Sequence, residues 1–359
     1  VNVENQKISL FKQKNRWGMT IASIVLCLVV SPVLGLMLFL PQIATVLPVV
    51  LMALLGFAGP VSAAACSAVL IALCASLFGV WGAVVAALFF VPVVIVSALA
   101  VEQGRAFWPS VAVGGVAMFA SMGAVMALLS FLAGSDIVSA ISQMTRQMFD
   151  MSGALGDSLL SMMMQLGLIT AQDGSSLSMT ALDSATREQL VSSIVMMMDS
   201  VLRLEIPMQM ATGSVAAGVL GQAVLRRGLL SRGDKVDYPP LRTWMVPSGW
   251  GRVLGITLVA LYLLAMLVPQ VSSSMYYVFS GVFEQVFALQ GIAALCYFLH
   301  ERGKSRTLQG AVFVLGYFLL RPPAILFGIA DQAFDFSHRR AKIQGEKKRL
   351  NPFDPRSRS

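Results

Sequence analysis

The N-terminal part of the chain contains a long run of uncharged, mostly apolar residues. No Asp, Glu, Lys or Arg occurs between Trp17 and Val101, and Pro or Gly interrupts this run at 40–41, 59–60 and 79. One crossing of a membrane's hydrocarbon core needs only about 20 apolar residues in a helix. Because backbone that faces lipid must satisfy its hydrogen bonds internally, the run is expected to fold as several helices separated at these breaks.

Similar apolar stretches recur along the rest of the chain. The predicted membrane spans lie near residues 18–39, 42–58, 61–78, 80–101, 110–133, 207–225, 252–269 and 276–299, with a further apolar segment at 308–329. Arg321, Pro322 and Pro323 interrupt that last segment, and successive prolines disfavour a straight helix. It is therefore either another span or a re-entrant segment that enters and leaves on one side. The expected fold class is all-α, a polytopic transmembrane helix bundle of about eight or nine spans.

Basic residues cluster at one set of span ends. The clusters are Lys7, Lys12, Lys14 and Arg16 before the first span, Arg226, Arg227, Arg232, Lys235 and Arg242 after the sixth, and Arg302, Lys304 and Arg306 after the eighth. Cytoplasmic loops carry an excess of Lys and Arg. Alternation from a cytoplasmic N-terminal tail, 1–17, places each cluster inside. The prediction is an inner-membrane protein, and the re-entrant alternative also keeps the basic tail, 337–359, in the cytoplasm.

A less apolar region, 134–206, separates a predicted five-span bundle, 18–133, from a C-terminal membrane bundle, 207–336. Apolar residues recur every three or four positions, which is typical of amphipathic helices. They are Ile137, Ile141, Met144, Met148 and Met151, and later Leu190, Ile194, Met197, Val201 and Leu204. We expect an extracytoplasmic helical insert that packs as a hairpin on itself, on the bundle or in the lipid interface.

The methionines of this insert admit two interpretations. Thioethers are soft ligands that select Cu(I), and Met144, Met148 and Met151 share one helix face. The alternative is that methionine fills irregular apolar contacts. The alternative is favoured, because the insert contains neither Cys nor His.

The composition indicates a membrane protein and argues against several other classes of function. The chain is 57% hydrophobic and 12% charged, a balance typical of membrane proteins. Its net charge of +8 lies at span ends rather than on one folded face, so nucleic acid is not an expected partner. The cysteines fall in apolar spans and are expected to be small buried hydrophobes: Cys27, Cys66, Cys74 and Cys296. No catalytic, metal or cofactor constellation is recognisable, so the chain is not expected to be an enzyme.

Two ribbons of small residues suggest helix packing faces. One runs along the third predicted span and the other along the sixth: Ala64, Ala68, Ala72 and Ser76, and Gly213, Ala217 and Gly221. Small residues let membrane helices approach closely. We expect both ribbons to join helices within this protein, with a separate membrane partner as the alternative.

Ionisable residues inside predicted spans are few, and such residues are functional candidates by default. Glu284 lies in the eighth span, near Gln285 and Gln290, and Arg321 lies in the last apolar segment. At 1.5 Å per residue, Glu284 lies roughly 15 Å and Arg321 roughly 9 Å below the outer face of the core, a gap that their long side chains can close. An ion pair between Glu284 and Arg321 is predicted. The alternatives are an intramembrane polar site for a substrate or ion, and an Arg321 that extends to the interface.

The C-terminal sequence GIADQAFDFSHRR resembles the signature of the YybS-like family of uncharacterised bacterial multi-pass membrane proteins. The matching positions are Gly328, Asp331, Phe334, Asp335, Phe336 and Arg339. Two further stretches are similar to that family, RTWMVPSGW at 242–250 and ALQGIAALCYFLHERGK at 288–304. Ser337 and His338 depart from the pattern, where a basic residue is more usual.

The YybS-like family is in turn distantly similar to the S components of energy-coupling factor transporters. That resemblance implies a substrate-binding membrane subunit that needs a separate coupling protein with ATPases. The chain itself contains no G-x-x-x-x-G-K-[ST] motif. The function predicted is a non-catalytic membrane scaffold or regulator that binds the lipid bilayer and other membrane proteins. The alternative is an S-component-like subunit of a micronutrient transporter.

Overall fold

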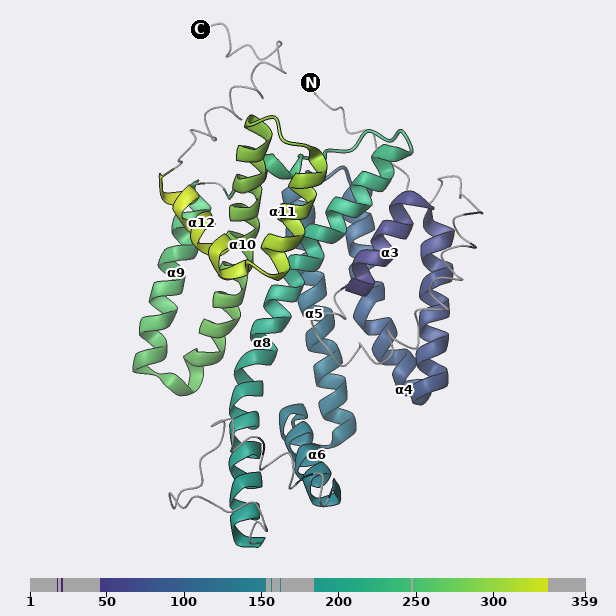
Figure 1. Cartoon of the computed structure of the whole chain (residues 1–359). Coiled ribbons are helices and arrows are strands. Elements are labelled where there is room, and N and C mark those ends of the chain that lie inside the picture. Colours follow the sequence, from purple (N-terminus) through teal and green to yellow (C-terminus); the bar gives the residue numbers. More distant parts are fainter. Residues whose placement is uncertain are drawn as a thin grey trace, which may run out of the picture. The chain divides into compact units, whose positions relative to one another are not determined.

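The computed structural model describes residues 46–152, 184–246 and 248–334, with single residues at 18, 21, 156 and 162. Every regular element in these ranges is helical (Figure 1). The helices are α3 (Val46–Phe57), α4 (Pro60–Glu102), α5 (Phe107–Ala133), α6 (Ile137–Ser152), α8 (Ser184–Ser231), the 3₁₀ turn η2 (Leu241–Thr243), α9 (Ser248–Leu267), α10 (Pro269–Glu301), α11 (Arg306–Phe318) and α12 (Arg321–Phe334). The predicted tails 1–17 and 337–359, and nearly all of the first predicted span, lie outside the described residues.

The chain divides into two compact units. The first comprises residues 1–122 and 208–359, and the second comprises residues 123–207. The predicted insert, 134–206, falls within the second unit. Its extracytoplasmic location stays a prediction.

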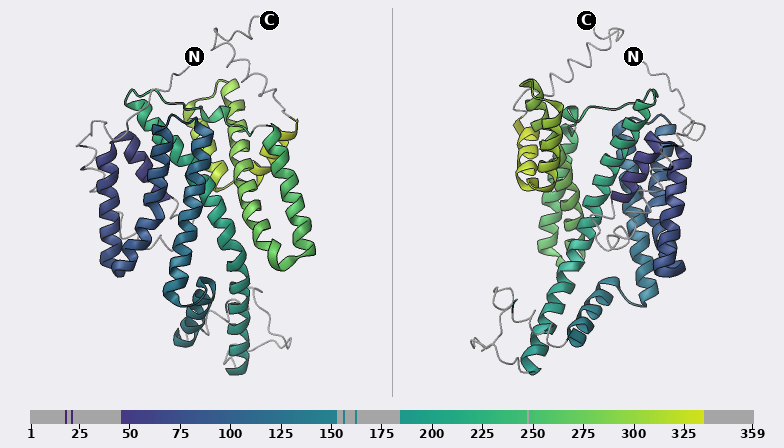
Figure 2. Two further views of the ribbon diagram at one scale, coloured as in Figure 1. Left: turned by 180° about the vertical axis from the view of Figure 1, so that it is seen from behind. Right: turned by 45° about the vertical axis from the view of Figure 1, so that its right-hand side comes forward.

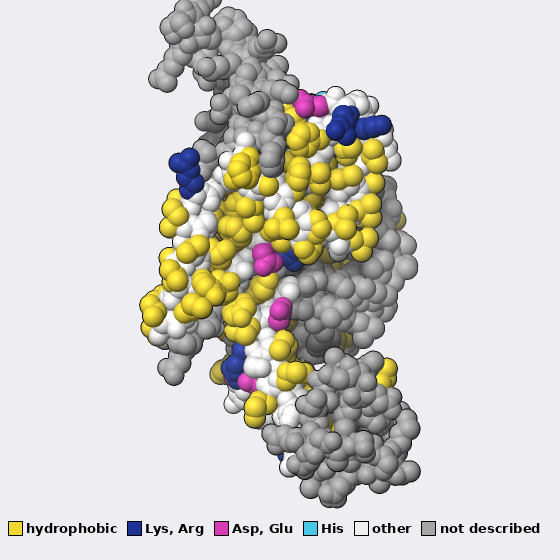
Figure 3. Space-filling model, turned by 60° about the vertical axis from the view of Figure 1, so that its left-hand side comes forward, with side chains coloured by type: hydrophobic (Ala, Val, Ile, Leu, Met, Phe, Trp, Pro, Cys, Tyr) yellow, Lys and Arg dark blue, Asp and Glu magenta, His cyan; other side chains and the backbone are white. Residues whose placement is uncertain are grey.

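Four helices in the described ranges are long and apolar enough to cross a membrane: α4, α5, α9 and α10. A fifth results if α11 and α12 count as one broken span. This number is smaller than the predicted one for four reasons. The first predicted span is not described, and α3 has 12 residues and is only about 18 Å long. The two arms of α4 are counted as one helix, and α8 is too polar over the predicted sixth span. On one face of the molecule, hydrophobic side chains cover most of the described surface (Figure 3).

Helix α4 consists of two arms. Gly79 has a non-helical backbone with φ 69° and ψ −166°, a region that favours glycine. Figures 1 and 2 show the chain folding back on itself there, so the arms correspond to the predicted third and fourth spans. The break therefore lies where the sequence placed it.

The two small-residue ribbons have different surroundings. On α8, Ala217 is buried, and a Cβ on Gly218 would lie 2.7 Å from the carbonyl oxygen of Val111 in α5. On α4, all members of the ribbon are exposed: Ala64, Ala68, Ala72 and Ser76. The prediction that the α4 ribbon joins two helices is wrong for the described part of the chain. The buried face of the same arm instead carries larger side chains, among them Cys66, Leu70 and Cys74. Cys296 is also buried, as expected, and Cys27 lies outside the described residues.

The last apolar segment is sharply bent. Ser305 caps α11 by accepting a hydrogen bond from the Leu308 N–H at 3.3 Å. Helices α11 and α12 meet at 107°, with the break just before Arg321. The bend excludes a straight ninth span and agrees with the interruption expected at the two prolines. Both a broken span and a re-entrant segment fit this geometry.

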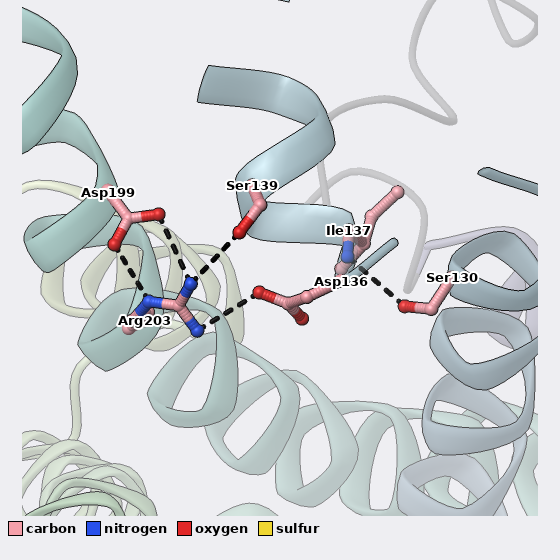
Figure 4. A network of polar contacts seen from close by, with 6 residues as sticks. All are labelled: Ser130, Asp136, Ile137, Ser139, Asp199 and Arg203. Atoms are coloured by element: carbon pink, nitrogen blue, oxygen red, sulfur yellow. Dashed lines mark hydrogen bonds and ion pairs between the residues drawn. The ribbon is translucent and has the colours of Figure 1, made fainter. Parts of the chain in front are cut away.

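In the second unit, polar contacts join α8 to the start of α6 (Figure 4). Arg203 donates to Asp199 at 2.8 Å and to Ser139 Oγ at 3.1 Å, and its Nη1 lies 3.0 Å from Asp136 Oδ2. The Ile137 N–H donates to Ser130 Oγ at 3.2 Å. The hydrogen bond to Asp199, with the charges of Asp199 and Asp136, raises the pKa of Arg203 above its usual value.

The predicted apolar stripes of this unit are only partly used. Leu190 and Ile194 are buried together with Val191, and Phe149 of α6 packs against them. Met197 and Val201 are exposed, and so are Met144, Met148 and Met151 on α6. The α6 methionines therefore do not fill apolar contacts among the described residues, contrary to the favoured interpretation.

Candidate functional site

The buried side chain of Gln290 joins three separate segments. Its Nε2 donates to Asp331 Oδ2 at 3.1 Å and to Gln332 Oε1 at 3.0 Å, both on α12. Its Oε1 accepts from the backbone N–H of Val246 at 3.2 Å. Gln290 itself lies on α10 and is 2% exposed. We call these four residues the Gln290 junction.

Close helix crossings allow these short side chains to meet. A Cβ on Gly328 would collide with the carbonyl oxygen of Phe287, and a Cβ on Gly291 would collide with that of Ala324. Helices α10 and α12 therefore touch backbone to backbone beside the junction. Gly251 on α9 meets a side chain instead, because a Cβ there would collide with the amide of Gln332.

The stretches that carried the sequence resemblance converge at this junction. Val246 belongs to the 242–250 stretch, Gln290 to the 288–304 stretch, and Asp331 to the C-terminal signature with Gly328. Phe334 ends α12 and is exposed. The remaining signature positions lie outside the described residues: Asp335, Phe336 and Arg339.

The structure groups Gln290 differently from the sequence interpretation. That interpretation placed Gln290 with Glu284, whereas the structure places it with Asp331 and Gln332. Positions 284 and 290 are about 9 Å apart along one helix, too far for their side chains to share partners on α12. Gln332 and the Val246 N–H were missed. The polar pair Asp331-Gln332 within an apolar helix was the available signal.

Glu284 and Arg321 lie beside each other. Arg321 Nη2 is 3.6 Å from Glu284 Oε2, and the side chains are 30% and 33% exposed. Ser280 Oγ donates to Glu284 Oε1 at 3.4 Å. Nε and Nη2 of Arg321 are buried and have no hydrogen-bond partner among the described residues. The 3.6 Å between Nη2 and Glu284 exceeds hydrogen-bond distance. The next residue along α10, Gln285, donates from Nε2 to the Tyr317 hydroxyl at 3.0 Å.

A second buried polar centre surrounds Arg226, which sequence reasoning treated only as a cytoplasmic charge. Its guanidinium donates to the carbonyl oxygens of Asp237 at 2.7 Å and Arg105 at 2.8 Å, and to Ser110 Oγ at 2.7 Å. Its Nε donates to Gln222 Oε1 at 3.2 Å. Arg226 is 1% exposed, so a full charge is held inside protein by hydrogen bonds. In the sequence, the only signal that Arg226 has buried polar partners was Gln222, one helical turn earlier.

Aromatic rings surround this Arg226 centre. The guanidinium carbon lies 5.8 Å from the Phe107 ring centroid, a cation–π distance. Phe107 packs at 5.5 Å against Trp244, whose Nε1 donates to the carbonyl oxygen of Pro239 at 3.0 Å. Burial raises the pKa of Tyr238 above its usual value, and the charge of Arg227 partly offsets this. The 237–246 segment therefore packs into the bundle and connects the Arg226 centre to the Gln290 junction.

The comparison with family models identifies the chain at family level. A model described as "Predicted membrane protein (DUF2232)" matches residues 19–332. The chain belongs to this family. The match covers every described candidate span, the Arg226 centre and the whole Gln290 junction. No curated protein and no solved structure matches the chain.

These sites differ in what they can do chemically. The Gln290 junction and the Arg226 centre use their polar groups to hold backbone segments together. The Glu284–Arg321 pair is partly exposed and could exchange its contacts with a polar ligand or a partner's side chain. In the described residues no group of three or more His, Cys, Asp or Glu could hold a metal ion.

Proposed function

We propose that this DUF2232 protein is a non-catalytic membrane scaffold or regulator that binds other membrane proteins through its C-terminal helices. The observation that supports this is the Gln290 junction. Gln290 and Asp331 are buried and Gln332 is half-buried, and Gln290 bonds to both, so these groups fix the position of α12 rather than face a substrate. Buried polar groups that bond to one another specify one arrangement of the segments they join.

The fixed helix presents an apolar outer face. Leu326 is 69% exposed and Ile329 is also exposed, while Gly328 on the other side meets α10. In a bilayer, such a face contacts either lipid or another helix. A scaffold uses it for a partner helix, which binds at lower entropic cost when α12 is already held in place.

Photo-crosslinking tests this proposal. A photoreactive amino acid at Leu326 in the full-length protein in native membranes should give a discrete protein adduct. The same residue at Val116, which is also highly exposed on α5, is the matched control and should give mainly lipid adducts. Gln290→Leu should abolish the Leu326 adduct without affecting membrane insertion. Lipid adducts alone at both sites would contradict the scaffold role.

We further propose membership of the YybS-like group and the orientation implied by its basic clusters, with the N-terminus in the cytoplasm of a bacterial cell. Lys235 is exposed in the loop after α8 and is suited to labelling. Lys235→Cys should resist a membrane-impermeant maleimide in intact cells and react after permeabilisation. Labelling from outside would reverse the topology.

A second candidate is an S-component-like substrate-binding subunit. The specific observation in its favour is the partly exposed Glu284–Arg321 pair, with Arg321 donors that no described residue accepts from. Such a subunit would copurify with a coupling protein and ATPases, and native mass spectrometry from mild detergent would find a small molecule. Loss of that molecule in Arg321→Gln would favour transport over scaffolding.

A further inference from the structure

The bend between α11 and α12 by itself fits both a broken span and a re-entrant segment, and the contacts of the two helices distinguish them. Helix α11 runs antiparallel to α10. Near the start of α11, Cys296 Sγ donates to the carbonyl oxygen of Gln309 at 3.5 Å, and near its end the Tyr317 hydroxyl accepts from Gln285. Along α11 the chain therefore travels from the C-terminal end of α10 to its middle.

Helix α12 does not continue on this path. It begins at Arg321 beside Glu284 and ends beside the first turn of α9, where a Cβ on Gly251 would collide with Gln332. Glu284 lies 15 positions after Pro269, the first residue of α10, so about 22 Å of α10 extend beyond the bend. In Figures 1 and 2, neither α11 nor α12 reaches the connection between α9 and α10.

The start of α11 and the end of α12 therefore lie on one side of the membrane. Helices α9 and α10 are candidate spans that run antiparallel and are joined at Val268, so the first turn of α9 and the C-terminal end of α10 share a side (Figure 1). The chain changes direction by 107° at the bend, which is more than a right angle. Helix α12 thus turns back from the end of α11 rather than extending it.

A charge lies at the bend. The two residues before Arg321 are apolar and exposed, Leu319 at 72% and Leu320 at 55%. Glu284 is ten residues, about 15 Å, beyond Ser274, where the candidate span in α10 begins. At such a depth a charged side chain is stable only if it is paired or reaches polar surroundings. Glu284 Oε2, 3.6 Å from Arg321 Nη2, supplies the opposite charge.

We propose that α11 and α12 form a re-entrant hairpin, which enters and leaves the membrane on the side of the 237–246 segment, and that the Glu284–Arg321 pair holds its tip inside. The Gln290 junction fixes the other end of α12, where Gln290 donates to Asp331 and Gln332. Breaking the ion pair releases the tip while the junction retains the end of the helix. This device holds for a scaffold and for a transport subunit alike.

Cysteine labelling of the full-length protein in intact cells tests the path of the hairpin. Ala333→Cys lies in the last turn of α12, Lys235→Cys in the loop after α8 and Ser274→Cys near the opposite end of α10, and all three positions are exposed. A membrane-impermeant maleimide should label A333C under the same conditions as K235C and under the opposite conditions to S274C. The unaltered protein gives the background. Because the sites are compared with one another, the result does not depend on which face is cytoplasmic. If A333C behaved like S274C, the segment would be a broken span and the proposal would fail.

A second cysteine tests the ion pair. With the pair intact, L320C should react slowly from either side, because the tip lies in the membrane. Adding Glu284→Gln leaves Arg321 unpaired, and the reaction from the side of K235C should rise at least about tenfold as the tip withdraws toward water. The exchanged pair E284R/R321E should return the reaction of L320C to near its original rate.

A matched variant separates withdrawal of the tip from loss of fold. E284Q/R321Q removes both charges, so L320C should stay as unreactive as it is with the pair intact. High reactivity in this variant would show that the side chains only stabilise the fold. Unchanged reactivity in E284Q, or high reactivity in the exchanged pair, would show that the ion pair does not hold the tip.

Discussion

Two helices of the larger unit differ in polarity and in burial. The C-terminal part of α8 carries polar side chains that are buried, whereas α9 is apolar and exposed. Thr212, Ser214 and Gln222 of α8 are at most 5% exposed, although this stretch is too polar to count as a candidate span. Helix α9 does count as one, yet only 6% of its apolar window is buried and Ile256 is 70% exposed. In a bilayer the more apolar of two helices therefore need not be the more buried one.

The physical reason lies in what surrounds each helix. Lipid tails are as apolar as leucine, so burying an apolar face in protein gains little over leaving it in lipid. A polar side chain has no partner in lipid but finds one between helices. Gln222 Nε2, for example, donates to the carbonyl oxygen of Ser97 at 3.3 Å. The central position of α8 follows from its polar residues.

Removing the Arg226 guanidinium should give the largest effect. Arg226→Met keeps the apolar stem but leaves the Arg105 and Asp237 carbonyl oxygens and Ser110 without their donor, so the free energy of unfolding should fall by about 3 kcal/mol or more. Unfolding in mixed micelles, followed by tryptophan fluorescence, measures this. Arg252→Met on exposed α9 should have little effect. Equal losses in both variants would contradict the central role of α8.

Glycine substitutions test close packing at the next level. Gly328→Val places a side chain against the Phe287 carbonyl oxygen and should reduce the free energy of unfolding by about 2 kcal/mol. Gly255 on α9 has no atom within 4 Å of its Cβ position, so Gly255→Val should fold normally. The same detergent unfolding assay compares them. A stable Gly328→Val protein would mean that α12 does not cross α10 at this point.

Making α8 more apolar should destabilise the protein. Gln222→Leu removes a donor to Ser97 and an acceptor for Arg226, and should cost about 1.5 kcal/mol although hydropathy rises. Asparagine at this position is the control for side-chain chemistry and should recover part of the loss. A gain in thermal stability for Gln222→Leu would show that apolarity alone governs this helix.

The smallest effect is expected on the exposed face of α9. Ile256→Ala should change the free energy of unfolding by less than about 0.5 kcal/mol, because few protein contacts are lost. Thermal unfolding in detergent with the unaltered protein in parallel checks this. A loss of several degrees would reveal a contact for α9 beyond those in the structure, such as a partner.

Several features were predictable because they depend on local chemistry. Gly79 breaks α4 where glycine interrupts an uncharged run, and the segment before Pro322 and Pro323 bends because two donors are missing. Glu284 and Arg321 lie 3.6 Å apart because opposite charges in neighbouring apolar helices favour pairing. The family-level match agrees with the membrane class that composition indicated.

The sequence by itself determined that the described chain is helical and apolar, and where its helices break, because periodicity and Pro or Gly positions act over one or two turns. Only the tertiary structure decided which helix is central, which ribbon of small residues meets another helix, and that Gln290 pairs with Asp331 rather than Glu284. These outcomes depend on neighbours that are distant in sequence. Because lipid and protein interiors are equally apolar, hydropathy alone does not distinguish a helix face that meets one from a face that meets the other.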